Sequence, residues 1–371
     1  MAADLTRIAA AAYLADRSTP RPTTFSRTIA LTVHTVDPEP WNAQPGRLVE
    51  DLLTWLTGDQ WQLTAAAASA PDNAPAPIAT ADDVMLLSGG MDSLCGAADH
   101  LADGRSRIHL SHYDASTAIR HAQTTAVSWL NTRATQPIRH LALKVCQTGT
   151  PREASSRSRS LLFAALASTV AASASSPHVI VPENGFTSIN PPLTAARGGA
   201  LSTRSTHPGT FARLNQLLTT LSLPIHISNP YAYLTKGQLL TRAHQRTDGG
   251  VLAATAATLS CSKLDGARYT GGNPNHNCGL CLACLVRRAA FTDGPYPDPT
   301  PYLVDTLADD ARGNLLRRRR RDMRDIQQLL LTGIDDTDLL AVGDVPLDTD
   351  IDAVMDLCQR GLQELSRVPL P

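Results

Sequence analysis

The sequence predicts an α/β protein organised around a doubly wound parallel sheet, and three observations carry this prediction. Strand-like and helix-like segments alternate along residues 82–258, which is typical of parallel sheets. A glycine-containing turn follows the first of these strands, at the edge where such sheets bind ligands. Four clustered cysteines follow the alternating region and indicate a metal site.

The elements are expected in the following order. Residues 1–65 form a small α/β N-terminal region, with a strand at 28–34 and a helix at 48–56. Residues 66–81, rich in Ala and Pro, form a linker. Residues 82–258 form the central α/β domain, with strands at 84–87, 107–112, 140–145 and 178–181 and helices at 94–101, 121–132 and 158–174. Residues 259–292 form a cysteine knot, and residues 293–371 form a helical C-terminal extension.

The turn after the strand at 84–87 is the most informative segment. It reads Ser88, Gly89, Gly90, Met91, Asp92 and Ser93. Two glycines let the backbone approach a phosphate closely, and the free N–H groups of a helix start attract anions. The hydroxyls can add donors, and Asp92 can hold a metal or a ribose-side group. The segment resembles the pyrophosphate loop of enzymes that cleave ATP to AMP and pyrophosphate, although an ordinary capped turn between strand and helix remains the alternative.

Composition excludes several classes. The chain has 371 residues and a formal net charge of −1 at pH 7, so no global field recruits nucleic acid or an anionic membrane. We find no apolar run of membrane-spanning length and no signal peptide. Seven cysteines, four of them clustered, fit a reducing compartment, so we expect a cytoplasmic protein.

The cysteine cluster predicts a closed metal site. Cys261, Cys278, Cys281 and Cys284 include two successive C-x2-C steps, which bring three thiolates together, with Cys261 as the fourth ligand. Four thiolates saturate Zn²⁺, and this predicts a structural zinc. An iron–sulfur cluster uses the same ligands and remains an alternative.

Other polar groups are candidates for substrate contacts. Arg157 and Arg159 open a helix and can clamp a phosphate or carboxylate, although a surface helix start would look the same. Lys236 is one of only three lysines in an arginine-rich chain, which favours a specific role for its amine, although it can equally be a solvated helix end. Further candidates for substrate binding are Glu183 and Asn184, directly after a strand, and Thr203, Arg204 and His207 in a polar loop.

These motifs together resemble the 7-cyano-7-deazaguanine synthase (QueC) family over residues 82–292. The matching segments are SGGMDS, SRSRSLLFAALA, LTKGQLL and CGLCLACLVRRAAF, in that order. The resemblance implies an adenine-nucleotide-hydrolase-like (HUP) fold, a structural zinc, and ATP-dependent adenylation of the carboxylate of 7-carboxy-7-deazaguanine. It implies that residues 88–93 hold pyrophosphate and that Lys236 lies near the activated centre. On this basis Asp92, Lys236 and Arg159 are expected to be catalytic, with Mg²⁺ bridging phosphates near Asp92.

The departures from that family point to a divergent member. The stretch at 183–208 and the terminal extensions are similar to the QueC-like proteins of Qat-type anti-phage defence systems. We therefore expect a ligase that passes a deazaguanine-type acyl group to an amine, with a protein partner from the same operon and no direct nucleic-acid ligand. The N-terminal region and the basic run at 317–321 are expected to bind that partner. The N-terminal region carries Trp41, Trp55 and Trp61, which favour interfaces when exposed, although buried core tryptophans are the commoner case. Two alternatives are a queuosine-pathway nitrile synthase and a non-catalytic module that senses nucleotide.

Overall fold

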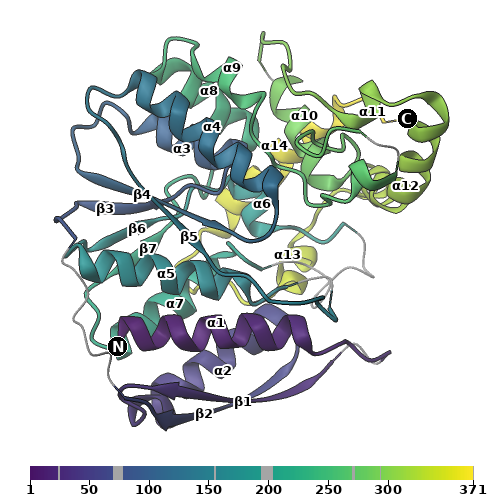
Figure 1. Ribbon diagram of the computed structural model, residues 1–371. Coiled ribbons are helices and arrows are strands. Elements are labelled where there is room, and N and C mark those ends of the chain that lie inside the picture. The colour runs from purple at the N-terminus through teal and green to yellow at the C-terminus, as the bar shows by residue number, and fades with distance from the viewer. Residues whose placement is uncertain are drawn as a thin grey trace.

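The computed structural model describes residues 1–23, 26–69, 78–153, 156–193, 204–269, 272–292 and 294–370. Its centre is a parallel sheet in the strand order β5-β4-β3-β6-β7 (Figure 1). The strands are β3 (Asp83–Leu86), β4 (Arg107–Tyr113), β5 (Arg139–Lys144), β6 (His178–Ile180) and β7 (His226–Ser228). The predicted α/β class is confirmed. The order of strands reverses between β3 and β6, and the carboxyl ends at such a switch point form a ligand-binding crevice.

Helices cover both faces of this sheet (Figure 1). One face carries α3 (Met91–Asp99), α4 (Thr117–Arg133), α8 (Lys236–Arg246) and α9 (Val251–Thr255), which share a hydrophobic core with Met85 and Leu87. The other face carries α5 (Arg159–Ser173) and α7 (Pro208–Thr220), which pack on Val84, Ile108 and Leu110. Successive residues of β3 therefore contribute to different cores, Val84 to one and Met85 to the other.

Helix α3 begins earlier than the sequence predicts. The expected start was Leu94, but the helix starts at Met91, directly after Gly90. Gly90 is extended, with φ −79° and ψ 166°, and this conformation at the N-cap position lets the helix begin at the next residue. Asp92 and Ser93 consequently belong to the first helical turn rather than to a loop.

The N-terminal residues form α1 (Ala2–Ser18), β1 (Thr28–Thr35), the 3₁₀ turn η1 (Pro40–Asn42), α2 (Gln44–Thr57) and β2 (Gln60–Ala67). Strands β1 and β2 pair in parallel, and α1 packs against α5 of the main sheet. One continuous hydrophobic core joins this region to α5 and α7. Trp41 and Trp61 are only 1% and 6% exposed, so they are core residues and do not offer an aromatic surface to a partner.

The C-terminal half contains α6 (Gly185–Ile189), the 3₁₀ turn η4 (Gly266–Tyr269), α10 (Leu282–Thr292), α11 (Leu303–Thr306), α12 (Asp309–Thr332), α13 (Asp336–Val342) and α14 (Ile351–Ser366). The expected helical extension is confirmed. Helix α14 does not stay at the periphery, because it packs against both α10 and α6. A third core joins it to the cysteine knot.

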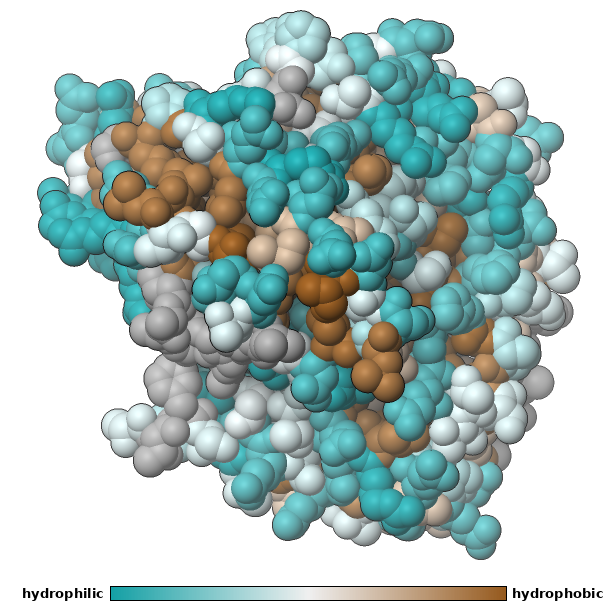
Figure 2. Space-filling view, turned by 180° about the vertical axis from the view of Figure 1, so that it is seen from behind, coloured by the Kyte–Doolittle hydropathy of each residue, from teal (hydrophilic) through white to brown (hydrophobic). Residues whose placement is uncertain are grey.

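Most apolar side chains lie in these three cores. The rear face is largely hydrophilic, and its hydrophobic residues gather in separate patches (Figure 2). None of the helices in the described part of the chain combines the length and apolar character that a membrane crossing requires.

Candidate active site and metal centre

The loop of residues 88–93 lies at the carboxyl end of β3 and is held in a defined conformation. The Ser88 hydroxyl donates to Ser93 Oγ at 3.1 Å, and the Gly90 N–H donates to Ser88 Oγ at 3.3 Å. Across the loop, the Leu259 N–H donates to the carbonyl of Gly89 at 2.9 Å. The loop is thus tied both to its own helix and to the segment that leads into the cysteine knot.

Gly89 is required where it stands. Its φ of +86° lies in the left-handed region, and a Cβ there would come within 3.0 Å of the Gln123 backbone nitrogen. Gly90 has more room, because its nearest neighbour for a Cβ would be Ser88 Oγ at 3.3 Å. The helix α4 that carries Gln123 therefore presses against this turn from one side. A larger residue at position 89 would displace the loop.

Asp92 is the centre of a buried polar cluster. Its Oδ1 accepts a short hydrogen bond from the Lys236 ammonium, and both side chains are only 7% exposed. Its Oδ2 accepts from the Asn184 backbone N–H at 3.1 Å and from Asn184 Nδ2 at 2.7 Å. Three residues that the sequence placed on separate segments therefore meet, contributed by α3, α8 and the segment after β6.

The environment of this cluster shifts the pKa values of two neighbouring carboxyl groups, Asp92 and Glu183, in opposite directions. Burial opposes ionisation of Asp92, but the Lys236 charge and the hydrogen bonds outweigh it and lower the pKa of Asp92 to about 2. Burial and the neighbouring Asp92 charge raise the pKa of Glu183 well above its usual value. One carboxylate is thus held ionised beside a second carboxyl that favours its protonated form, a division common at reactive sites.

A cleft of about 1250 Å³ opens beside this cluster. Among the predicted site residues, Ser88, Glu183, Arg157 and Arg159 line it. Asp92, Asn184 and Lys236 are buried and do not line it. The cleft also extends to Cys261, so it reaches from the loop at the end of β3 to the cysteine knot.

Arg157 and Arg159 are positioned by the N-terminal helix. The buried Asp16 carboxylate of α1 accepts from the backbone N–H groups of Arg157 and Ser158 at 3.0 and 3.1 Å, and therefore caps the start of α5. Arg159 lies over the Phe163 ring, with its Cζ 5.7 Å from the ring centre. The buried Nη1 of Arg157 has no hydrogen-bond partner among the described residues. Both cations border the cleft, where an anionic group of a ligand can reach them.

Arg204 and His207 occupy a different place. The Arg204 guanidinium stacks 4.1 Å from the Trp55 ring centre, and the buried His207 ring lies 5.4 Å from the same ring. His207 also caps α7 by accepting from the Gly209 N–H at 3.1 Å. Neither residue lines the cleft. Their role in substrate binding stays a prediction, while the contacts seen are those of packing, and Thr203 lies outside the described residues.

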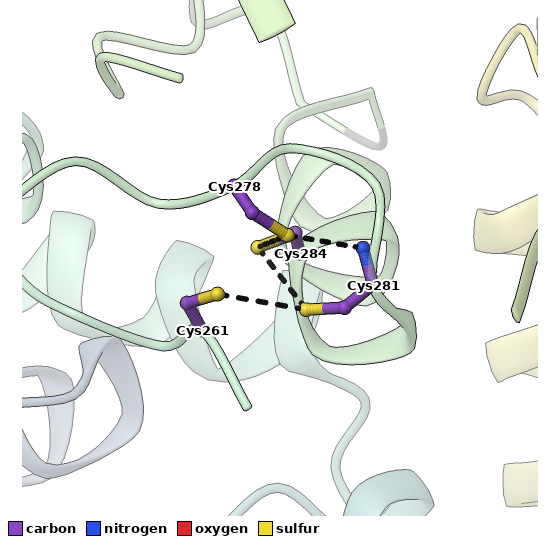
Figure 3. Close-up of side chains that lie close together, drawn as sticks. All are labelled: Cys261, Cys278, Cys281 and Cys284. Carbon is purple, nitrogen blue, oxygen red and sulfur yellow. Dashed lines mark hydrogen bonds between the residues drawn. The ribbon is translucent and has the colours of Figure 1, made fainter. Parts of the chain in front are cut away.

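The four cysteines converge on one point (Figure 3). All four sulfur atoms lie within 4.8 Å of one another, and the Cys261–Cys281 and Cys278–Cys284 pairs are each 3.8 Å apart. A tetrahedral Zn²⁺ with Zn–S bonds of about 2.3 Å requires sulfur separations of about 3.8 Å. A cluster of several irons would hold the sulfurs farther apart. The geometry therefore fits a single tetrahedral ion, and the predicted zinc knot is consistent with it.

The knot is joined to the loop at the end of β3. Ser260, one residue before the first cysteine, accepts a hydrogen bond from the Met91 N–H at 3.3 Å. The buried Asn277, one residue before the second cysteine, accepts from the Ser260 N–H at 3.0 Å. The fully buried Arg287 of α10 donates to Ser260 Oγ at 3.1 Å. A metal that orders the knot would thereby also order the loop.

Several cleft residues escaped the sequence analysis. They are His112 and Phe163, whose rings lie 5.0 Å apart, Ser205 and Thr206, and the cations Lys263, Arg318 and Arg319. The basic run at 317–321 was noted in the sequence, and its expected binding to a partner stays a prediction. Arg319 is 3% exposed, pairs with Asp265 and lines the cleft, so this part of the run does not lie on a free surface.

Fold and site together define an α/β protein with a glycine-containing loop at the switch point of its sheet and a four-cysteine knot beside it. Residues 206–294 match the family model described as queuosine biosynthesis protein QueC. The matched segment includes Lys236 and all four cysteines, whereas the loop at 88–93 precedes it. The match supports a QueC-like family and, with it, an ATP-using synthase or ligase. A search of curated proteins found no match to the chain.

Proposed function

We propose that this protein is an ATP-dependent, QueC-like enzyme that adenylates a carboxylate, releases pyrophosphate and passes the acyl group to an amine. The observation that carries the proposal is the junction of the 88–93 loop with the Asp92–Lys236 pair at the edge of a cleft. Backbone N–H groups at a helix start and a buried ammonium together suit a polyphosphate. The match to QueC supports the use of ATP.

The proposed roles follow from position. Ser88, Gly89, Gly90, Met91 and Ser93 hold the pyrophosphate part of ATP. Lys236 exchanges its contact with Asp92 for a phosphate oxygen as charge develops there, which would stabilise the transition state. Asp92 accepts hydrogen bonds on both oxygens, so Mg²⁺ arriving with ATP would share this carboxylate with Lys236 and Asn184 or displace one of them.

The substrate is proposed to be a deazaguanine-type carboxylate. Its carboxylate would lie near Arg157 and Arg159, and its ring would lie in the part of the cleft lined by His112 and Phe163. The altered 183–208 stretch and the terminal extensions support an acceptor other than ammonia. We propose a protein partner from the same operon as that acceptor, and a role in anti-phage defence.

A second candidate function is the synthesis of 7-cyano-7-deazaguanine in queuosine biosynthesis, and the QueC match favours it. The two candidates share the adenylation step and differ in the acceptor. Incubation with ATP, 7-carboxy-7-deazaguanine and ammonia, followed by mass spectrometry, separates them. Formation of the nitrile by the protein alone supports the queuosine candidate. A mass gain on a co-purified partner supports conjugation.

The shared step has its own test. Wild-type protein is expected to form AMP and pyrophosphate from ATP when a carboxylate substrate is present, and Asp92→Asn is expected to lose this activity while it still binds zinc. Formation of ADP and phosphate would contradict the proposal. Nucleotide binding without any cleavage would instead indicate a sensing module.

A further inference from the structure

The C-terminal helix α14 contacts the turn that carries Lys236. The Glu364 side chain is 5% exposed and lies at the start of α8. It accepts a short hydrogen bond from the Thr235 hydroxyl and a second bond, at 3.3 Å, from the Gly237 N–H. Thr235 and Gly237 are the two neighbours of Lys236. A carboxyl group at a helix N-terminus satisfies free N–H donors and complements the helix dipole.

A second residue of α14 holds the same turn. Arg360, one helical turn before Glu364, donates from Nη2 to the Tyr233 carbonyl at 3.1 Å. Its Nη1 donates to Oε1 of Gln238, the residue that completes the capping box with Thr235. The segment from 233 to 238 is therefore fixed from outside as well as by its own cap.

Glycines permit this close approach at three points. A Cβ on Gly237 would lie 2.6 Å from Glu364 Oε1, and one on Gly185 would lie 2.7 Å from the Leu357 side chain. A Cβ on Gly361 of α14 would lie 2.3 Å from the Phe186 ring. Gly185 and Phe186 directly follow Asn184, the other partner of Asp92. Helix α14 thus packs against both elements that hold Asp92.

We propose that Glu364 is a positioning residue that fixes the first turn of α8 and thereby holds Lys236 against Asp92. The C-terminal extension is then part of the active site rather than only a partner-binding appendage. An effect of Glu364 on AMP formation depends on the proposed function of Lys236, whereas its effect on the position of Lys236 does not. Two measurements therefore separate the claims.

The first measurement observes Lys236 directly. The chain has three lysines, Lys144, Lys236 and Lys263, so protein labelled with ¹³C at lysine Cε gives three signals that single Lys→Arg variants assign. Glu364→Gln replaces one acceptor oxygen by an NH₂ group that faces donors. We expect it to shift the Lys236 signal and leave those of Lys144 and Lys263 in place. Arg360→Gln, a milder change, is expected to shift the same signal less.

Val354→Ala is the matched control. Val354 is a buried residue of α14 about 15 Å from Glu364 along the helix axis, and its truncation weakens the docking of the helix without removing a contact to the turn. We expect it to lower thermal stability but to leave the Lys236 signal unchanged. A folded Glu364→Gln protein with an unshifted Lys236 signal would overturn the inference, and so would an equal shift in Val354→Ala.

The second measurement is AMP formation. Displacement of a catalytic group by about 1 Å can cost about 100-fold in rate, so Glu364→Gln is expected to lower kcat by about 10- to 100-fold and to change KM for ATP by less than about twofold. Val354→Ala should keep the wild-type kcat. An unchanged kcat in Glu364→Gln would count against the positioning of a catalytic Lys236. If the wild-type protein forms no AMP, the proposed function fails, and the lysine signals alone decide the positioning.

Discussion

The buried pair of Asp92 and Lys236 should behave as an energetic unit. Both side chains are 7% exposed, so removing one leaves an uncompensated charge away from water. Breaking such a pair typically costs about 3–5 kcal/mol. The fall in the pKa of Asp92 from 3.8 to about 2 corresponds to a net gain of about 2 kcal/mol for its ionised form. We expect each of Asp92→Asn and Lys236→Met to destabilise the protein by about 3 kcal/mol.

The double variant decides whether these losses share a cause. If the ion pair accounts for both losses, the double variant Asp92→Asn with Lys236→Met should lose about 2 kcal/mol less free energy of unfolding than the two single variants lose together. Urea unfolding followed by circular dichroism and tryptophan fluorescence measures all four proteins. Strictly additive losses, with no coupling energy, would refute the reasoning.

The pH dependence supplies an internal check. The folded-state pKa of Asp92 is lowered, so its contribution to stability is fully present above the ordinary value of 3.8 and is lost as pH falls through about 2. In Lys236→Met this contribution is reduced. The stability gap between wild type and Lys236→Met should therefore be largest above about pH 4 and shrink toward pH 2. A gap that widens on acidification would contradict this account.

The remaining predictions concern the metal, the second carboxyl group and the N-terminal helix. Cys281→Ser should lose the single zinc and destabilise the protein by several kcal/mol, as metal analysis and thermal unfolding would show, because the knot depends on its ion. A visible absorption band in the wild type would instead indicate iron–sulfur. The pKa of Glu183 is raised in the folded protein, so its contribution to stability is present below pH 4.5 and is lost as pH rises through the raised pKa. Glu183→Gln cannot ionise and should therefore show a smaller decline in stability over this pH range, measured by urea unfolding. Asp16→Asn removes one of the two carboxylates that pair with the buried Arg27 and weakens the cap of α5, so it should cost about 2 kcal/mol and raise KM for the carboxylate substrate. An unchanged KM would show that α1 does not position the residues that bind the substrate.

Local signals were enough to predict much of the fold. The strands predicted at 84–87, 107–112, 140–145 and 178–181 correspond to β3, β4, β5 and β6 to within one residue at each end. Runs of apolar β-formers between turn residues identify such strands. Strand β7 has three residues and offers no measurable period. Helix α1 also escaped, because its alanine-rich sequence has only weak amphipathic contrast.

The candidate site also combines features that local sequence predicts with features that depend on long-range contacts. The spacing of Cys278, Cys281 and Cys284 and the glycines of the 88–93 loop are encoded within a few residues, so the sequence by itself was enough to predict a metal knot and an anion-binding loop. Which groups surround them depends on contacts between distant segments. Lys236 meets Asp92 across 144 positions, and Glu364 meets Thr235 across 129.

Only the tertiary structure decided these pairings, because they join segments far apart in the sequence. Burial and the distance to neighbouring charges then set the protonation state of each group. Arg204 and His207 looked like substrate ligands in a polar loop, yet folding places both against Trp55. Asp16 and Glu364 carried no local signal, yet they hold the starts of α5 and α8. The sequence determined the chemistry available to this protein. The fold determined which residues can take part in it, because helix packing brings Asp16 of α1 to the start of α5 and Glu364 of α14 to the start of α8.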